Sequence, residues 1–285
     1  MNESNDSKQP RFYQMTEHPQ EIRLMAALTM RKKPMVFLSG ILLFYVMTEL
    51  VPQLLGIYAP ASYVDVLTSA TAIDETIAAQ LPKTPFVYML YIAFFSGAFH
   101  LGLRAYLLHY LRQGEAKVSL VFEGMTHFFK MLILFIVQNF IIACGLSLFV
   151  IPGIYFMFSF SQAYYLMAEN PKLSVFRCLV ASWRIMDGNR FRLFLLDLTY
   201  VILIIMGSLP YAIVSSQSLV DPSTIQGILT LFAAAIPQYC AYGFLFLGQT
   251  VFFEVLVKEG FDHFNEPGED IIREFRNQHR PSAEE

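Results

Sequence analysis

The amino-acid sequence predicts an all-α integral membrane protein, a bundle of six transmembrane helices with amphipathic helices at its cytoplasmic interface. Of its 285 residues, 55% are hydrophobic and 15% are charged, whereas soluble domains carry about 25% charged residues. The hydrophobic residues are gathered in stretches long enough to cross a hydrocarbon layer of about 30 Å. The Lys and Arg residues fall almost entirely on one side of those stretches, which is typical of a multi-pass membrane protein.

The chain divides into a polar amino-terminal segment over 1–33, a six-span membrane domain over 34–258 and a charged tail over 259–285. Both end segments are expected in the cytoplasm. Segment 1–33 contains no apolar core of the signal-peptide type. We therefore expect no cleaved signal, and the first span would itself anchor the protein.

The first three spans are expected over 35–58, 86–111 and 128–150. The 24 residues of the first span reach about 36 Å at about 1.5 Å per residue, which is enough to cross. Pro52 is expected to kink the outer end of this span. The loop over 59–85 combines acidic residues with Pro, Ser and Thr and is expected to lie in water.

Residues 154–168 supply a fourth span, which is too short by itself for a full crossing. Pro152 and Gly153 are expected to form a turn before it, and no polar residue surrounds that turn. A turn placed at the lipid boundary would lend this span the missing length.

The last two spans are expected over 191–214 and 225–257. The latter has 33 residues, too many for one straight crossing, so Pro237 is expected to kink or break it. Nineteen of the 20 Lys and Arg residues lie on one side of the six spans, and only Lys83 lies on the other. The positive-inside rule therefore places both termini in the cytoplasm.

Two cytoplasmic segments, 116–130 and 171–186, carry apolar side chains at helical spacing opposite charged ones. This pattern predicts helices that lie along the membrane surface. Asn170 and Pro171 supply N-cap and first-turn signals for the second helix, and Gly188 supplies its stop. The apolar positions are Val118, Val121, Phe122, Met125, Phe128 and Phe129 in the first segment, Leu173, Phe176, Leu179, Val180, Trp183 and Met186 in the second, and Ile22, Met25 and Ala26 in a weaker stripe over 19–33.

Three short motifs lie between Phe122 and Phe194: Ile151-Pro152-Gly153-Ile154, Glu169-Asn170-Pro171 and Met186-Asp187-Gly188-Asn189. In combination they resemble an uncharacterised family of bacterial polytopic membrane proteins, catalogued as domain of unknown function nine hundred and seventy-five. That family is distantly similar to the membrane domain attached to some glycerophosphodiester phosphodiesterases. The resemblance implies six helical spans in a bacterial plasma membrane, and it carries over no active site.

The sequence lacks the common catalytic motifs. None of the six histidines belongs to a His-Glu-x-x-His helix, and no Gly-x-Ser-x-Gly turn occurs. Asp197 is the best-placed intramembrane carboxylate, but Glu49 and Glu254 are expected at other depths, so an aspartyl dyad is not expected. Three widely separated cysteines are expected to be buried, inert thiols: Cys144, Cys178 and Cys240. We therefore expect no enzyme, no metal site and no cofactor, and the net charge of −3 gives no support for nucleic-acid binding.

The first functional hypothesis is a non-enzymatic protein of the bacterial envelope, a lipid-interacting or scaffold component whose partners are membrane lipids. A basic residue near an anionic membrane surface contributes about 1 kcal/mol. The simpler role of the surface helices is to tile the cytoplasmic face and to set the angle of the next span. The residues expected to contact lipid headgroups are Arg177, Arg184, Arg190 and Arg192.

The alternative hypothesis is a small transporter or lipid-moving protein with a polar path through the spans. A path of this kind requires polar side chains that face one common interior. The candidates are His100, Arg104, Gln138, Asn139, Gln162, Asp197 and Gln249.

Arg104 and Asp197 are expected at similar depth on different spans. A charged group near the bilayer centre costs roughly 2.5–3.5 kcal/mol on insertion scales, so each should find a partner. One possibility is a direct pair, with His100 as a third member. The other is that Arg104 extends to lipid phosphate while Asp197 bonds to a neighbouring hydroxyl or water.

Overall fold

The computed structural model describes residues 15, 17–58, 85–216, 220–221 and 223–258. The predicted tail over 259–285, the start of the amino-terminal segment and the loop over 59–84 lie outside the described residues. The described part of the chain is α-helical and contains no strand, which confirms the all-α class.

The helices follow one another along the chain with short connections. A π-helical turn, η1 (Val46–Leu50), joins α2 to α3, and a 3₁₀ turn, η2 (Val118–Phe122), precedes α7. The α-helices are α1 (Pro19–Lys32), α2 (Pro34–Tyr45), α3 (Val51–Tyr58), α6 (Phe86–Gln113), α7 (Glu123–Thr126), α8 (Phe128–Leu148), α9 (Val150–Ser159), α10 (Ala163–Glu169), α11 (Val175–Ile185), α12 (Arg190–Ser215) and α13 (Ile225–Val257).

Five helical segments of the described chain are long and apolar enough to cross a membrane: Pro34–Tyr58, α6, α8, α12 and α13. The fourth predicted span, 154–168, is instead divided between α9 and α10, of 10 and 7 residues. The hydroxyl of Ser182 accepts the N–H of Gln162 at 3.2 Å and donates to the carbonyl oxygen of Ser159 at 2.8 Å. These two bonds replace helical backbone bonds, which explains the break.

Helix α13 continues through Pro237 as one helix of 33 residues, so the predicted break is absent. α12 lies against this point, because a side chain at Gly207 would come within 2.9 Å of the Pro237 carbonyl oxygen. The missing side chain at Gly207 thus lets the two helices approach closely where the proline interrupts the backbone bonding of α13.

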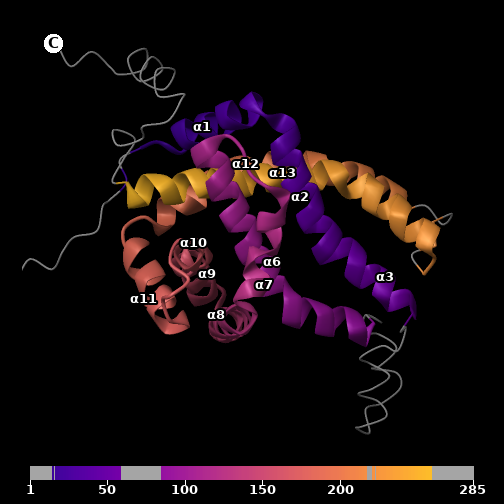
Figure 1. Cartoon of the computed structure of the whole chain (residues 1–285), viewed down its shortest axis with the longest axis horizontal. Helices are drawn as coiled ribbons and strands as arrows, with labels where there is room; N and C mark the ends of the chain where they lie inside the picture. Colours follow the sequence, from indigo (N-terminus) through magenta and orange to yellow (C-terminus); the bar gives the residue numbers. More distant parts are fainter. Residues whose placement is uncertain (1–14, 16, 59–84, 217–219, 222, 259–285) are drawn as a thin grey trace, which may run out of the picture.

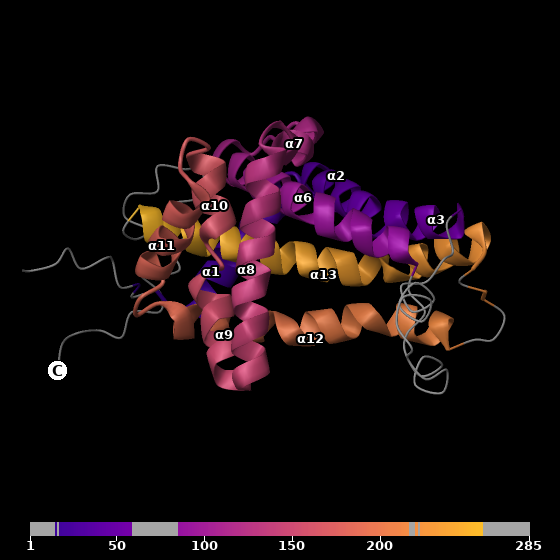
Figure 2. The same ribbon diagram turned by 90° about the horizontal axis from the view of Figure 1, so that it is seen from below.

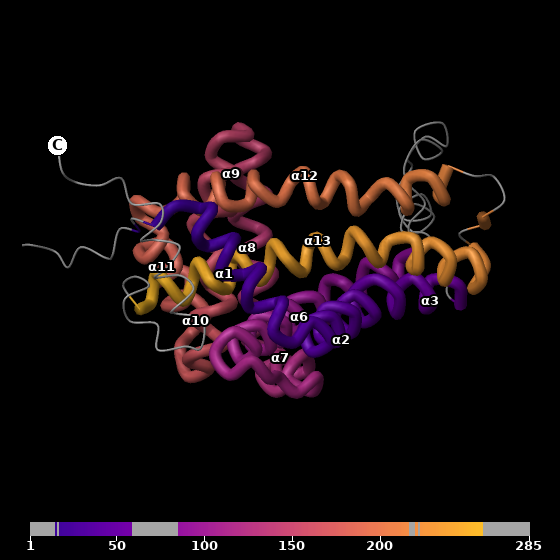
Figure 3. The backbone as a smooth tube through the Cα atoms, turned by 90° about the horizontal axis from the view of Figure 1, so that it is seen from above, coloured from indigo at the N-terminus to yellow at the C-terminus, as the bar shows by residue number. Residues whose placement is uncertain are grey.

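α12 and α13 run along the long axis, α2, α3 and α6 run obliquely to them, and α8 and α9 lie across all of these helices (Figures 1 and 2). α12 and α13 run side by side along the long axis, with α2, α3 and α6 on the opposite side of α13 (Figures 2 and 3). The antiparallel pair of α8 and α9 runs across the direction of α12 and α13, as the end-on view of α8 in Figure 1 and the side view in Figure 2 both show. α10 and α11 lie beside this pair, at the end of the molecule where α1 also lies.

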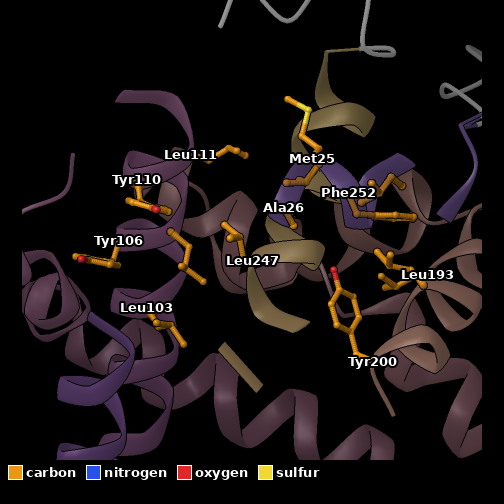
Figure 4. Close-up of a cluster of buried hydrophobic side chains, with 14 of the residues drawn as sticks. Met25, Ala26, Leu103, Tyr106, Tyr110, Leu111, Leu193, Tyr200, Leu247 and Phe252 are labelled. Atoms are coloured by element: carbon orange, nitrogen blue, oxygen red, sulfur yellow. The ribbon is translucent and has the colours of Figure 1, made fainter. Parts of the chain in front are cut away.

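The main hydrophobic core is formed where α1 packs against α6, α12 and α13 (Figure 4). Tyr110 of α6 bonds to the carbonyl oxygens of Thr29 and Lys33, each 3.1 Å away, and Tyr106 donates to that of Val36. These hydroxyls attach α6 to the corner between α1 and α2. The predicted helix over 19–33 is confirmed with its buried positions, Ile22, Met25 and Ala26.

The predicted surface helix over 116–130 is wrong. The segment contains η2, α7 and the start of α8, with a break at His127. It packs tightly on α6, because a side chain at Gly102 would overlap the carbonyl oxygen of Val121, and one at Gly124 would overlap that of Ala98. The segment therefore lies against protein backbone, and a continuous helix on the membrane surface is not formed.

The predicted helix over 171–186 is found as α11, but it starts at Val175 with Ser174 in the N-cap position. The cap predicted at Asn170 and Pro171 is therefore wrong, while Gly188, with φ +79°, ends the turn that follows the helix as predicted. The buried face also differs from the predicted stripe, because the bonds of Ser182 turn its side of α11 inward. The buried residues of α11 are Val175, Cys178, Leu179 and Ser182.

The three cysteines differ in exposure. Cys178 is buried and Cys240 is half-buried, but Cys144 is exposed on α8, so the prediction of a buried thiol is wrong at that position. Burial raises the pKa of Cys178, although the charge of Lys130 opposes this effect. The Cys178 thiol is therefore neutral near pH 7.

Candidate functional site

Arg104 lies in the interior of the bundle, only 8% exposed. Its guanidinium carbon lies 4.4 Å from the centre of the Phe246 ring and 5.2 Å from that of Tyr165. Its Nε and Nη1 atoms make no hydrogen bond to the described protein. The positive charge is therefore stabilised mainly by aromatic faces, and the side chain does not extend to lipid phosphate.

Asp197 on α12 is held by Gln249 on α13. The side-chain Nε2 of Gln249 donates to both carboxylate oxygens, at 3.1 and 3.2 Å. The predicted direct pair with Arg104 is not formed, since no ion pair joins these two groups among the described residues. The carboxylate instead bonds to a neighbouring side chain, in line with the other possibility, except that the donor is an amide.

The other candidates for a polar path are dispersed. His100 contacts the rings of Phe44 and Tyr164, with centroids 5.2 and 6.1 Å apart. Asn139 is exposed and bonds only to its own helix, and Gln138 is half-buried on the same helix.

Gln162 is buried in the turn between α9 and α10 and bonds to Ser161 at 3.0 Å. A groove of about 350 Å³ between α2 and α13 is lined by none of the seven candidates. Of the seven candidates, only Asp197 and Gln249 are therefore hydrogen-bonded to each other.

A charged cluster at the carboxyl-terminal ends of α6 and α13 is absent from the sequence predictions. The carboxylate of Glu254 is fully buried and accepts bonds from Arg112 at 3.0 and 2.7 Å and from Lys258 at 2.9 Å. Arg112 also pairs with Glu169, which belongs to the Glu-Asn-Pro motif. An acidic residue inside an apolar stretch is the signal that could have revealed this cluster, because such charges require partners.

Arg190, a predicted headgroup contact, is bonded within the protein. Its guanidinium donates to Ser159 at 2.8 Å, to Asp187 at 3.0 Å and to the Trp183 carbonyl oxygen at 3.1 Å. It also lies over the ring of Tyr155, 4.4 Å from its centre. Each of its three guanidinium nitrogens therefore donates one bond, which connects the start of α12 to the end of α9, to α11 and to the turn between α11 and α12.

Arg192 is half-buried and donates to the carbonyl oxygen of Glu17 at 3.3 Å. It attaches the start of α12 to the residues before α1. Part of the hydrogen-bonding capacity of Arg192, one of the four predicted headgroup contacts, is therefore used within the protein.

Arg177 and Arg184 are exposed on α11, as expected for headgroup contacts. Beside them on the same side of the helix lie Phe176, 67% exposed, and Val180, 51% exposed. We call these four residues the outer face of α11. An exposed helix face that mixes cationic and large apolar side chains is typical of a helix at a membrane interface.

Three predicted motif positions have clear structural roles. The turn predicted at Pro152 and Gly153 lies instead at Phe149, and both residues belong to α9. Gly153 packs against α8, where a side chain would overlap Leu146, and Pro152 stands in the first turn of α9. The Pro171 carbonyl oxygen accepts the Lys130 side chain at 2.8 Å. Among the described residues, no group of His, Cys, Asp and Glu is placed to hold a metal ion.

The comparisons with known proteins give one match. Residues 140–239 match the family model described as Protein of unknown function (DUF975). No curated protein and no solved structure matches the chain, and the distant likeness to glycerophosphodiester phosphodiesterases is not shown. The region from the second half of α8 to the middle of α13 is thus similar to an uncharacterised family of proteins of unknown function, DUF975.

Proposed function

We propose that this chain is a non-enzymatic, lipid-interacting protein of the bacterial plasma membrane, with both termini in the cytoplasm. The observation that carries the proposal is the outer face of α11, where Arg177 and Arg184 are exposed beside Phe176 and Val180. The orientation rests on the one-sided distribution of Lys and Arg.

The outer face of α11 suits anionic lipid for two reasons. Each cation close to an anionic surface contributes about 1 kcal/mol, so Arg177 and Arg184 favour anionic over neutral headgroups. Phe176 and Val180 add apolar surface that is buried when the helix meets the boundary between headgroups and acyl chains. Of the remaining basic candidates, Arg190 donates to the α11 backbone at Trp183, and Arg192 attaches α12 to the residues before α1.

The transporter alternative has weaker support. Its polar residues do not converge, because Asn139 faces outward from α8 and His100 is enclosed by aromatic rings. Only the bond between Asp197 and Gln249 favours a polar interior.

The proposal can be tested by fluorescence, because Trp183 is the single tryptophan of the chain and lies on α11. The purified protein is placed in vesicles that contain lipids brominated on their acyl chains, with neutral or anionic headgroups. We expect stronger quenching of Trp183 by the anionic brominated lipid. The Arg177→Gln and Arg184→Gln double variant should lose this preference.

The matched control removes two exposed charges elsewhere, Arg31→Gln with Lys117→Gln. This variant should quench like the wild type. Equal quenching by both lipids in the wild type, or an equal loss of preference in the control variant, would contradict the proposal.

A further inference from the structure

The hairpin of α8 and α9 is uncharged and mostly apolar. No Asp, Glu, Lys or Arg occurs from residue 131 to 168, and only Met131, Leu134 and Gly145 of α8 are buried. At the tip, the four residues 148–151 are between 64% and 81% exposed, and all four are large and apolar. A tip of this kind is unsuited to water, so it must be covered by lipid or protein.

The hairpin also lies across the direction of the long helices. Its α8 passes across α12 and α13 and its tip projects past α12 in Figure 2. Its α9 ends at the first turn of α12, where Ser159 accepts the Arg190 bond at 2.8 Å and Phe158 meets Phe194 with ring centres 5.8 Å apart. The hairpin is therefore attached at the end of the bundle that carries α11.

The length of α13 sets the depth of this attachment. Its 33 residues span about 50 Å, whereas the hydrocarbon core is about 30 Å thick. About 20 Å of α13 therefore extends past a crossing. α1 packs on that inner part, and Tyr165 of α10 stacks on its Phe253 with ring centres 4.9 Å apart. A helix that lies across the bundle near this level does not reach the opposite membrane surface.

We propose that the hairpin of α8 and α9 lies within the cytoplasmic leaflet, along the membrane plane, and that the chain crosses the membrane four times. The crossings are Pro34–Tyr58, α6, α12 and α13. Four crossings, like the six predicted from the sequence, leave both termini on one side. The proposal rests on the proposed function for which side is cytoplasmic.

The occupant of the exposed hairpin surface is the acyl-chain region of that leaflet. An all-round apolar helix is stable only in an apolar medium, and the turn satisfies much of its backbone internally. The N–H of Phe149 bonds to the Gly145 carbonyl oxygen at 3.0 Å, and that of Gly153 bonds to Phe149 at 3.4 Å. The close packing of Gly145 on Gly153 keeps the hairpin thin.

The outer face of α11 and the hairpin would then contact the same leaflet, one at the headgroups and the other at the acyl chains. A wedge placed in a single leaflet adds area to that leaflet alone. Binding by such a wedge favours loosely packed or curved membranes. The ligand class is therefore anionic phospholipid in a leaflet with loose chain packing.

The experiment uses the full chain in a background with Cys144, Cys178 and Cys240 replaced by alanine. Single cysteines are introduced at the tip, as Phe149→Cys, and at two exposed reference positions. Ser216→Cys reports the outer end of α12, and Lys172→Cys reports the inner side. Intact and permeabilised cells are treated with a membrane-impermeant maleimide.

We expect Ser216→Cys to react in intact cells, Lys172→Cys to react only after permeabilisation, and Phe149→Cys to stay at the level of the cysteine-free background in both. Reaction of Phe149→Cys in intact cells would mean that α8 crosses the membrane. Reaction only after permeabilisation would mean that the tip lies in the cytoplasm. Either result overturns the inference.

A spin label at Phe149→Cys separates lipid from protein as the cover of the tip. Embedding in acyl chains predicts frequent collisions with oxygen and few with a water-soluble nickel complex. Few collisions with both would mean that protein, such as a second copy of the chain, covers the tip, and this also overturns the inference. The Trp183 assay is independent, so loss of anionic preference with an embedded tip refutes only the proposed function.

Discussion

The carboxyl-terminal half of α6 and the whole of α8 are both mostly apolar helical segments, yet the first is enclosed by protein and the second is exposed. The buried residues of α6 all lie in its carboxyl-terminal part, from Ser96 onward, whereas the whole of α8 has only three buried residues. α6 has glycines at the contacts with η2 and α7 and two tyrosine hydroxyls that bond to neighbouring backbone. The difference shows that small residues and polar bonds, rather than apolarity, decide which membrane helices pack together.

The largest effect on stability is expected at the charged cluster of Glu254, Arg112 and Lys258, at the end of the enclosed half of α6. Glu254→Gln leaves Arg112 and Lys258 without their buried carboxylate, and removal of one partner of a buried pair costs about 3 kcal/mol. Thermal unfolding in detergent measures the loss. The double variant with Arg112→Gln should lose less than the sum of the two single variants, and strictly additive losses would show that the pair is not coupled.

A second test adds apolar bulk to α6 and to α8. Gly102→Ala should destabilise the protein by about 1–3 kcal/mol, because its methyl group would overlap the Val121 carbonyl oxygen. Ala143→Val adds bulk to an exposed position of α8 and should change the unfolding temperature little. Similar losses for both variants would mean that α8 is as tightly enclosed as α6.

A third test separates the two internal polar groups. Asp197 and Gln249 should show a coupling energy of about 1.5 kcal/mol in a double-mutant cycle, because a hydrogen bond to a charged group is lost. A cycle between Asp197 and Arg104 should give a clearly smaller coupling. If the second coupling equals the first, the carboxylate pairs with Arg104 in the membrane.

The smallest effect on stability is expected at the exposed ion pair between Lys33 and Glu115, which follows the end of α6. A hydrogen bond and an ion pair from Lys33 hold the pKa of Glu115 below its usual range. A lowered pKa contributes stability above the unfolded-state pKa, and this stability is lost as the pH falls through the lowered value. The small stability difference between the wild type and Glu115→Gln should therefore vanish in acid. A difference that persists there would contradict this assignment.

The site was less predictable than the fold, for a physical reason visible in particular residues. Arg190 and Arg177 are both basic residues near one surface, and their sequence contexts do not distinguish them. The first is enclosed by Ser159, Asp187 and Trp183, while the second stays exposed, and this depends on which side of α11 the Ser182 bonds turn inward. The cluster at Glu254 likewise joins residues that are 142 positions apart.

The sequence by itself determined the all-α class, the five long apolar helices and the helix over 19–33, because apolar length and helical period are local properties. Only the tertiary structure decided that 116–130 packs on α6, that 154–168 divides into two helices and that α8 lies across the bundle. Those outcomes depend on contacts between distant residues, such as Gly102 with Val121 and Ser182 with Ser159. An apolar stretch indicates only that the segment avoids water. Its contacts with neighbouring helices determine whether it packs against protein or lipid and in which direction it runs.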